Sequence, residues 1–209
     1  KQDLLQTGVV ENVASSDRVM IQGGNTDDRF TWQTKAKDNK VAIAFRNVSP
    51  EFIATSGMKL IEGKDFAPNS AAENSKVIIT QSMAKLMGEE SAVGKIIQSP
   101  RDNEEGFFSN MTVVGVISDY VYGDVYGETP GPVLFFCKTT DRAKLLYIRL
   151  KAASNLNEAL GKIEAVMKKD NPAFPFEYKF VDDQFNELFQ SEAQISKISS
   201  LFAVLAVFI

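Results

Sequence analysis

The sequence predicts an α+β fold, and the helix expected over residues 155–169 is the clearest evidence for it. Its apolar residues fall on one helical face, Asn155 and Glu158 resemble a capping box, and two lysines suit its negative end. Apolar stretches at 145–150 and 176–181 flank this helix and indicate strands. The order strand, helix, strand is typical of a split α+β layer with helices on one face of a sheet.

The beginning of the chain predicts a short helix followed by a meander of strands. Residues 3–10 carry helically spaced apolar side chains and turn at Gly8, and an extended stretch is expected over 13–21. A glycine-rich turn at 23–25 precedes a strand at 41–48. This turn lacks the third glycine and the following helix of a dinucleotide-binding loop, so it is interpreted as a turn and not as a phosphate site.

The middle of the chain predicts two short helices, each stopped by a glycine. Ser49-Pro50-Glu51 is a helix start, because serine caps free amides and proline suits the first helical position, and Gly57 offers the stop. A buried strand at 77–80 then runs into a second helix that ends at Gly88.

Two loops interrupt the strands that follow. Strands are expected at 96–97 and 111–117, and the polar loop 99–110 between them is a hairpin tip. The loop 119–132 holds five glycines or prolines and three tyrosines. It could be a binding loop or a packed connection. We favour packing, because buried tyrosines commonly anchor loops through their hydroxyl groups. A strand is expected after the loop, at 133–138.

Composition excludes several classes of function. The 209 residues include 23 basic and 27 acidic side chains, with a net charge of −4 and no Lys/Arg block, so nucleic-acid binding is not expected. The chain has no histidine and one cysteine, so Cys/His zinc sites, Ser-His-Asp triads and internal disulfides cannot form. Cys137 lies in an apolar run and is interpreted as a buried strand residue. We therefore predict no catalytic, cofactor-binding or metal residue, and no enzyme.

Both ends of the chain point to a domain removed from a longer protein. It opens at Lys1 without methionine or an export signal, which indicates that an upstream part is missing. No glycine or proline follows Pro175, so a continuous helix is expected from Asp183, with Leu188, Ile195 and Phe202 recurring every seventh residue. The uncharged run 201–209 is too short to span a membrane, and is either a packed helix end or a truncated membrane helix.

Three segments together resemble the periplasmic core domain of MacB-like and FtsX-like ABC-transporter permeases. They are Val48-Ser49-Pro50-Glu51-Phe52 with Gly57-Met58-Lys59-Leu60 and Gly63-Lys64-Asp65-Phe66; Val77-Ile78-Ile79-Thr80 with Gly88 and Val93-Gly94-Lys95-Ile96-Ile97; and Val113-Val114-Gly115-Val116-Ile117-Ser118-Asp119-Tyr120 with Pro132-Val133. Their order and spacing cover most of the chain. Thr80-Gln81 departs from the Asn-Glu that the family often has at this turn.

The resemblance implies a fold of two lobes and a set of partners. A split βαβ-type α+β lobe would comprise residues 1–47 and 133–185, with an inserted β-rich lobe at 48–132 and a helix at 186–209 that leads into a truncated transmembrane segment. An ABC-type ATPase would drive the permease through the membrane helices. The domain would lie in the periplasm, above the bacterial inner membrane, in a dimeric transporter that can engage a periplasmic adaptor protein.

Two other functions fit parts of the sequence. One is a periplasmic ligand-sensing domain of a membrane receptor, with the loop 119–132 as its pocket. The other is a hydrolase with paired carboxylates, either Asp182-Asp183 or Glu89-Glu90. Adjacent carboxylates diverge in direction on a helix or strand, so the hydrolase hypothesis is the weaker of the two. The expected function is the transmission of ATP-driven motion to the export or release of a substrate, or to a periplasmic partner.

Overall fold

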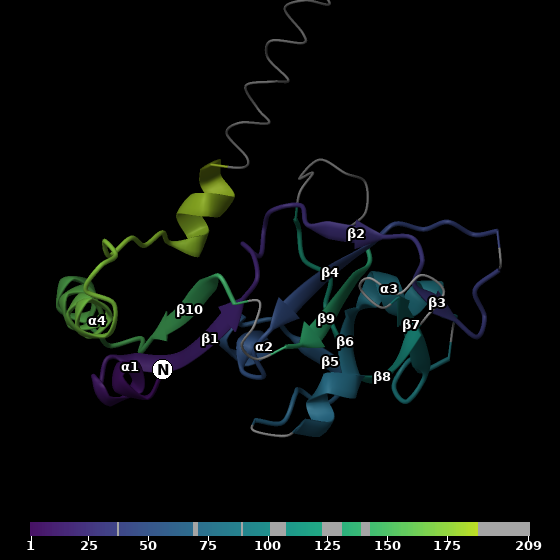
Figure 1. The fold of residues 1–209 in the computed structure, drawn as a ribbon, viewed down its shortest axis with the longest axis horizontal. Helices are drawn as coiled ribbons and strands as arrows, with labels where there is room; N and C mark the ends of the chain where they lie inside the picture. Colours follow the sequence, from purple (N-terminus) through teal and green to yellow (C-terminus); the bar gives the residue numbers. More distant parts are fainter. Residues whose placement is uncertain are drawn as a thin grey trace, which may run out of the picture.

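A computed structural model describes residues 1–36, 38–68, 71–88, 90–100, 108–122, 131–138 and 143–187. The strands are β1 (Val10–Ser16), β2 (Asn25–Asp27), β3 (Thr31–Trp32), β4 (Ile43–Val48), β5 (Leu60–Gly63), β6 (Lys76–Thr80), β7 (Ile96–Pro100), β8 (Phe108–Ile117), β9 (Val133–Cys137) and β10 (Leu145–Leu150). The helices are α1 (Gln2–Gln6), α2 (Phe52–Ser56), α3 (Gln81–Leu86) and α4 (Leu156–Asp170), with a 3-10 turn at Ala71–Ser75 and a helical stretch over 181–187 (Figure 1). None of the helices in these ranges is long and apolar enough to cross a membrane.

All ten strands of the described ranges belong to one mixed sheet. Its order is β10-β1-β4-β9-β6-β8-β7-β3, with β2 paired to β4 and β5 paired to β8. The pairs β4–β9 and β6–β8 are parallel, and the other pairs are antiparallel. The predicted α+β class is therefore confirmed.

The sheet continues across Asn47 and Pro132, because strands from both predicted lobes belong to it. The prediction that two lobes separate at these residues is therefore wrong. β9 pairs with β4 on one side and with β6, from the expected inserted lobe, on the other. All five residues of β9 are buried, as in a central strand that is covered on both faces. β9 therefore joins the two predicted lobes into one sheet, because β4 pairs with one of its edges and β6 with the other.

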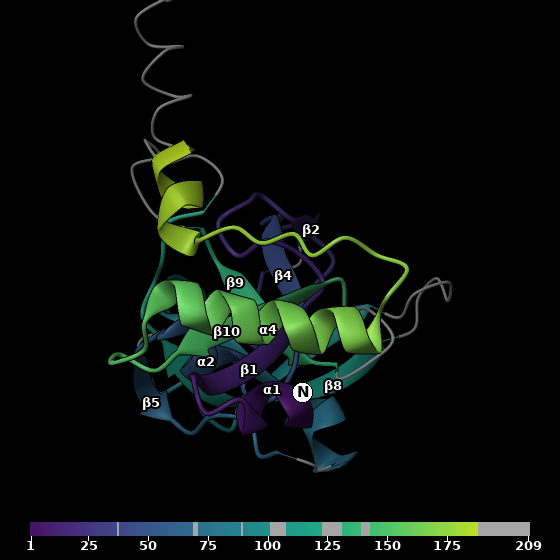
Figure 2. The same ribbon diagram turned by 90° about the vertical axis from the view of Figure 1, so that its left-hand side faces the viewer.

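The sheet is narrowest between β1 and β4, which share the single register pair Ser16↔Val48. On one side of this junction, α4 and α1 lie against β1 and β10 (Figures 1 and 2). We call this the terminal layer. Its core consists of Leu4, Val9, Val10, Val13, Ala159 and Ile163. The central sheet, on the other side, contains the remaining eight strands and has two cores, one of which also includes Ala14 of β1 and contacts Tyr147 of β10.

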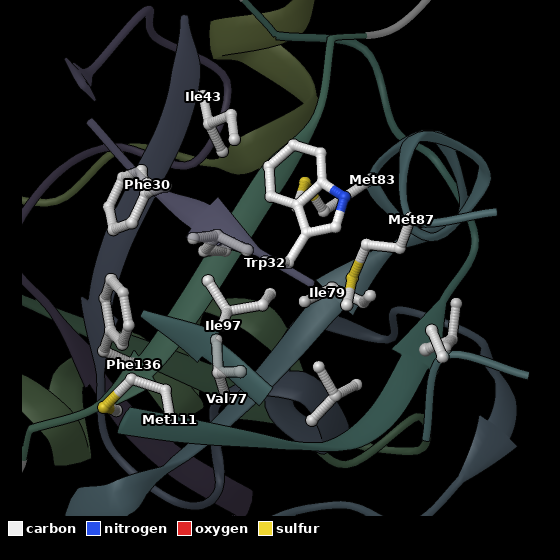
Figure 3. Close-up of a cluster of buried hydrophobic side chains, with 14 residues drawn as sticks. Phe30, Trp32, Ile43, Val77, Ile79, Met83, Met87, Ile97, Met111 and Phe136 are labelled. Carbon is white, nitrogen blue, oxygen red and sulfur yellow. The ribbon is translucent and has the colours of Figure 1, made fainter. Parts of the chain in front are cut away.

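The far half of the central sheet is closed by a cluster rich in methionine and aromatic residues (Figure 3). Trp32, on the short strand β3, packs there with Met83 and Met87. The Thr34 hydroxyl donates to the Met87 carbonyl at 3.0 Å and ties the segment after β3 to the end of the α3 helix. This half of the molecule is built of packed apolar side chains.

Most predicted elements are present, with differences in capping. Asn155 accepts a hydrogen bond from the Glu158 amide at 3.2 Å and caps α4 as predicted. Gly57 ends α2 at φ 74°, a conformation that favours glycine. Ser49 does not cap α2. Its hydroxyl accepts from the Ser15 amide at 3.0 Å, because it lies beside β1.

The expected strand at 176–181 is absent. Residues 171–180 form turns and an irregular stretch, and helical residues begin at 181. The alternating rings lie against one another instead of filling a sheet face, with 5.5 Å between the centroids of Phe176 and Tyr178 and the same distance between Tyr178 and Phe180. The strand, helix, strand unit predicted here is thus only half formed. The continuous helix expected from Asp183 is described to residue 187, and the rest lies outside the described residues.

The predicted loop 99–110 is shorter in the structure, because its described residues 99–100 and 108–110 belong to strands. β7 and β8 pair as far as Pro100↔Phe108, which confirms the hairpin and makes both strands longer than predicted. Residues 101–107, at its tip, lie outside the described residues. Of the loop 119–132, residues 119–122 and 131–132 are described.

Candidate functional site

Five aromatic side chains form a row through the core of the central sheet. The Tyr147 ring, on β10, lies 5.1 Å from Phe52 on α2, and Phe52 lies 6.2 Å from Phe135 on β9. Phe135 is 6.1 Å from Tyr120, which is 5.4 Å from Tyr122. We call these five residues the aromatic row. It connects the terminal layer, through β10, to the segment that follows β8.

The row is held by hydrogen bonds at its Tyr147 end. The Tyr147 hydroxyl accepts from the Met20 amide at 2.8 Å, which fixes the segment after β1. Burial raises the pKa of Tyr147 and of Tyr120 and Tyr122 at the other end of the row. All three phenols therefore stay protonated at neutral pH, and act as neutral packing groups and hydrogen-bonding groups.

Beneath Tyr122 lies Arg46, a charged residue of β4 that is 1% exposed. Its guanidinium donates to the carbonyl oxygens of Phe45 at 3.0 Å and Gln22 at 2.9 Å, and its Cζ is 5.4 Å from the Tyr122 ring centroid. No carboxylate of the described residues forms an ion pair with it. The Arg46 Nε and the Tyr120 hydroxyl are buried without hydrogen-bond partners. This charge is stabilised by the dipoles of the two backbone carbonyls and by the aromatic face.

The described ends of the loop 119–132 are tied to the turn between β6 and α3. The Ser82 amide donates to the Asp119 carboxylate at 2.8 Å, and the Ser82 hydroxyl donates to the Gly131 carbonyl at 3.1 Å. The Val133 amide donates to the Thr80 hydroxyl at 3.0 Å. These ends are a packed connection, as we favoured. Thr80, at the position where the sequence departs from the family pattern, supplies one of the anchors.

The segment before the terminal helical residues bridges the two sides of the molecule. Phe176 packs against the core of the terminal layer. Val181 packs against the buried cluster of the central sheet that contains Phe52 and Phe135. The helical residues 181–187 follow at once, with the Gln184 amide donating to the Phe180 carbonyl at 3.2 Å (Figure 1). The segment therefore contacts both sides of the β1–β4 junction.

The side chains considered for chemistry do not gather into one place. Cys137 is buried in β9, and burial, followed by the charges of nearby carboxylates, raises its pKa to about 11, so the thiol stays protonated. Asp182 and Asp183 are exposed neighbours on the terminal helix, Glu90 is exposed, and Glu89 lies outside the described residues. Within the described ranges, no three His, Cys, Asp or Glu side chains are arranged to hold a metal ion.

The sequence indicated the tyrosines of this site but not its buried arginine, Arg46. Tyr120 and Tyr122 were predicted to pack, whereas Arg46, Phe52 and Tyr147 were not singled out. An arginine in the middle of an apolar strand was the available signal, since charged residues are rarely buried without a reason. The row as a whole has no sequence signature, because its members come from four separate elements.

The family model that describes the MacB-like periplasmic core domain matches residues 2–166. The chain belongs to this family. The resemblance in the three segments of sequence is thereby confirmed. This MacB-like domain is the periplasmic domain of an ABC-transporter permease, and an ATPase partner follows in general terms from the family.

Solved structures share the fold of the MacB-like domain. The periplasmic region of MacB from Actinobacillus actinomycetemcomitans aligns with a TM-score of 0.58 and 14% identity, over 90% of this chain and 81% of that one. The extracellular domain of the noncanonic ABC-type transporter YknZ from Gram-positive bacteria aligns with a TM-score of 0.50 and 15% identity, over 82% and 83%. No curated protein sequence matches the chain.

Proposed function

We propose that this domain transmits ATP-driven motion from the membrane part of a permease to the export or release of a substrate, or to a periplasmic partner. The observation that supports this most is the bridge formed by residues 176–181. Phe176 contacts the terminal layer, Val181 contacts the central sheet, and a helix begins at the second of these contacts. Packed elements move as rigid bodies about narrow connections, and the β1–β4 junction is such a connection.

The aromatic row gives the central sheet a means to follow that motion. Tyr147 belongs to β10 of the terminal layer, and Phe52 belongs to α2, which lies against β1 and β10, while Phe135 and Tyr120 belong to the other side of the junction. Closely packed rings transmit displacement because protein interiors have low compressibility. A shift of β10 would therefore reach Tyr120 and Tyr122 at the loop 119–132.

The proposed setting is the periplasmic side of a bacterial inner membrane. The chain would be attached by flanking helices, driven by an ABC-type ATPase subunit or domain, arranged as a dimer and able to engage a periplasmic adaptor. The role needs no catalytic residue, cofactor or metal of its own. The protonated Cys137 and tyrosines are consistent with a mechanical and non-enzymatic domain.

The test is Gln184→Pro in the intact transporter, with Gln184→Ala as the matched control. Proline removes the amide that bonds the Phe180 carbonyl and costs about 3 kcal/mol in a helix. Transport per ATP hydrolysed should fall sharply in the proline variant and stay near the wild-type value in the alanine variant. Circular dichroism of the excised variant shows whether the domain still folds. A folded proline variant with unchanged transport would contradict the proposal.

A further inference from the structure

Residues 174–180 form an irregular aromatic segment in which three of the four rings are exposed and the backbone between its ends is unpaired. Phe174 is 73% exposed, Tyr178 53% and Phe180 38%, and Phe176 is half-buried. Within the described part of the chain, residues 175–179 make no backbone hydrogen bond. The segment thus combines apolar side chains in water with a free row of backbone donors and acceptors, the combination that favours the addition of another strand.

The charges between the rings are self-complementary. Glu177 and Lys179 alternate with the aromatic residues, so they lie on the opposite face of an extended strand. We propose that this segment pairs antiparallel with the same segment of a second copy of the chain, about a two-fold axis at Tyr178. Each Glu177 then faces the partner's Lys179, and each Phe176 faces the partner's Phe180. Tyr178 meets its own copy on the axis, and every other contact occurs twice, as in any two-fold interface.

Other registers are disfavoured by the same residues. Parallel pairing in register places Glu177 opposite Glu177 and Lys179 opposite Lys179. An antiparallel shift of two residues centres the axis on one of these charges and repels in the same way, because like charges directly opposite are destabilising. A shift of one residue brings aromatic side chains onto the charged face. The antiparallel register centred at Tyr178 satisfies both the rings and the charges.

Existing contacts leave these groups available. Lys179 Nζ lies 3.6 Å from Glu187, but both side chains are more than 60% exposed, so the pair contributes little and exchanges easily. None of the ion pairs of the described residues includes Glu177. The pairing uses only residues of this chain, so it can be tested without the rest of the transporter. It would supply one contact surface of the dimer in the proposed function, but it does not depend on transport.

Cysteine cross-linking of the purified 209-residue chain tests the register, in a Cys137→Ala background. Opposite Cβ atoms in an antiparallel pair are about 4.5 to 5.5 Å apart, which is close to disulfide reach. Tyr178→Cys should cross-link with itself. Glu177→Cys and Lys179→Cys should each cross-link poorly alone and efficiently when mixed. Equal cross-linking of all three single variants, or none for Tyr178→Cys, would overturn the proposal.

Charge reversal provides the second test, by sedimentation equilibrium of the same chain over a concentration series. Lys179→Glu and Glu177→Lys should each raise the dimer dissociation constant about tenfold or more, and the double variant should restore it. A wild-type chain that stays monomeric throughout, or a dimer unaffected by either reversal, would contradict the pairing. The second result would assign the dimer to another surface, such as the apolar run 201–209 or the outer edge of β10. Transport in the intact protein is measured separately, so failure here leaves the proposed function untouched.

Discussion

Asn47 donates its side-chain amide to the Asp17 carboxylate at 2.8 Å, at the point where β1 and β4 meet. The other Asp17 carboxylate oxygen accepts from the backbone amide of Asn47 at 3.2 Å, and the backbone amide of Asp17 donates to the backbone carbonyl of Asn47 at 3.0 Å. Both side chains are buried. The narrowest part of the sheet is therefore reinforced by a polar clasp that replaces a longer strand pairing.

The clasp predicts that Asp17→Ala destabilises the domain by about 1 to 3 kcal/mol. The substitution leaves the buried Asn47 amide without its acceptor, and an unsatisfied buried donor carries its full desolvation cost. Asp38→Ala is the control, since Asp38 is exposed. Urea unfolding of both variants gives the free energies. Equal stabilities for the two would show that the clasp contributes nothing.

We expect substitutions at Arg46 and Gly24 to have non-additive effects on the free energy of unfolding. A Cβ atom added at Gly24 would lie 1.9 Å from Nη1 of Arg46. Gly24→Ala should therefore cost about 1 to 3 kcal/mol in the wild-type chain, because moving the guanidinium would break its hydrogen bonds to the carbonyls of Phe45 and Gln22. In an Arg46→Ala background the same substitution should be nearly neutral. A double-mutant cycle measured by chemical unfolding checks this, and additive effects would contradict the packing described.

The pKa of Cys137 predicts a loss of stability in alkali. Burial raises this pKa from 9.0 to about 11, so between these values the unfolded chain releases a proton that the folded chain keeps. Below pH 9 the thiol is protonated in both states, so the folded state keeps its full stability. As pH rises from 9 to 11, only the unfolded state loses the proton, and the free energy of unfolding falls. Cys137→Ala should make this fall shallower by up to about 1.4 kcal/mol per pH unit. Unfolding curves at pH 8, 9, 10 and 11 measure the difference, and parallel curves for the two proteins would refute it.

The elements that the sequence predicted well are those whose signal is local. The cap and the apolar stripe of α4 are written within fifteen residues, and Gly57 ends α2 because it alone readily adopts φ 74°. The segment 176–181 shows the limit of such reasoning. Its alternation suits a strand, but pairing depends on a free neighbour, which no local pattern contains.

The site and the sheet order depend on contacts between distant residues. β9 has the same buried composition wherever it lies in a sheet, so its partners β4 and β6 could not be read from its sequence. Arg46 meets Gln22 and Tyr122 through the fold, across gaps of 24 and 76 residues in the chain. The tyrosines indicated packing, and an arginine within an apolar strand indicated a buried charge, but no local pattern indicated that the two lie together.

A distance measurement across the β1–β4 junction tests the central claim most directly. Spin labels at Lys162→Cys on α4 and Lys85→Cys on α3 occupy exposed positions on its two sides, in a Cys137→Ala background of the intact transporter. Double electron–electron resonance would compare the ATP-bound and nucleotide-free states. The account predicts two distinct distance distributions, and one unchanging distribution when Gln184→Pro interrupts the helix. A single distribution in both nucleotide states of the otherwise wild-type transporter would contradict the transmission of motion through this domain.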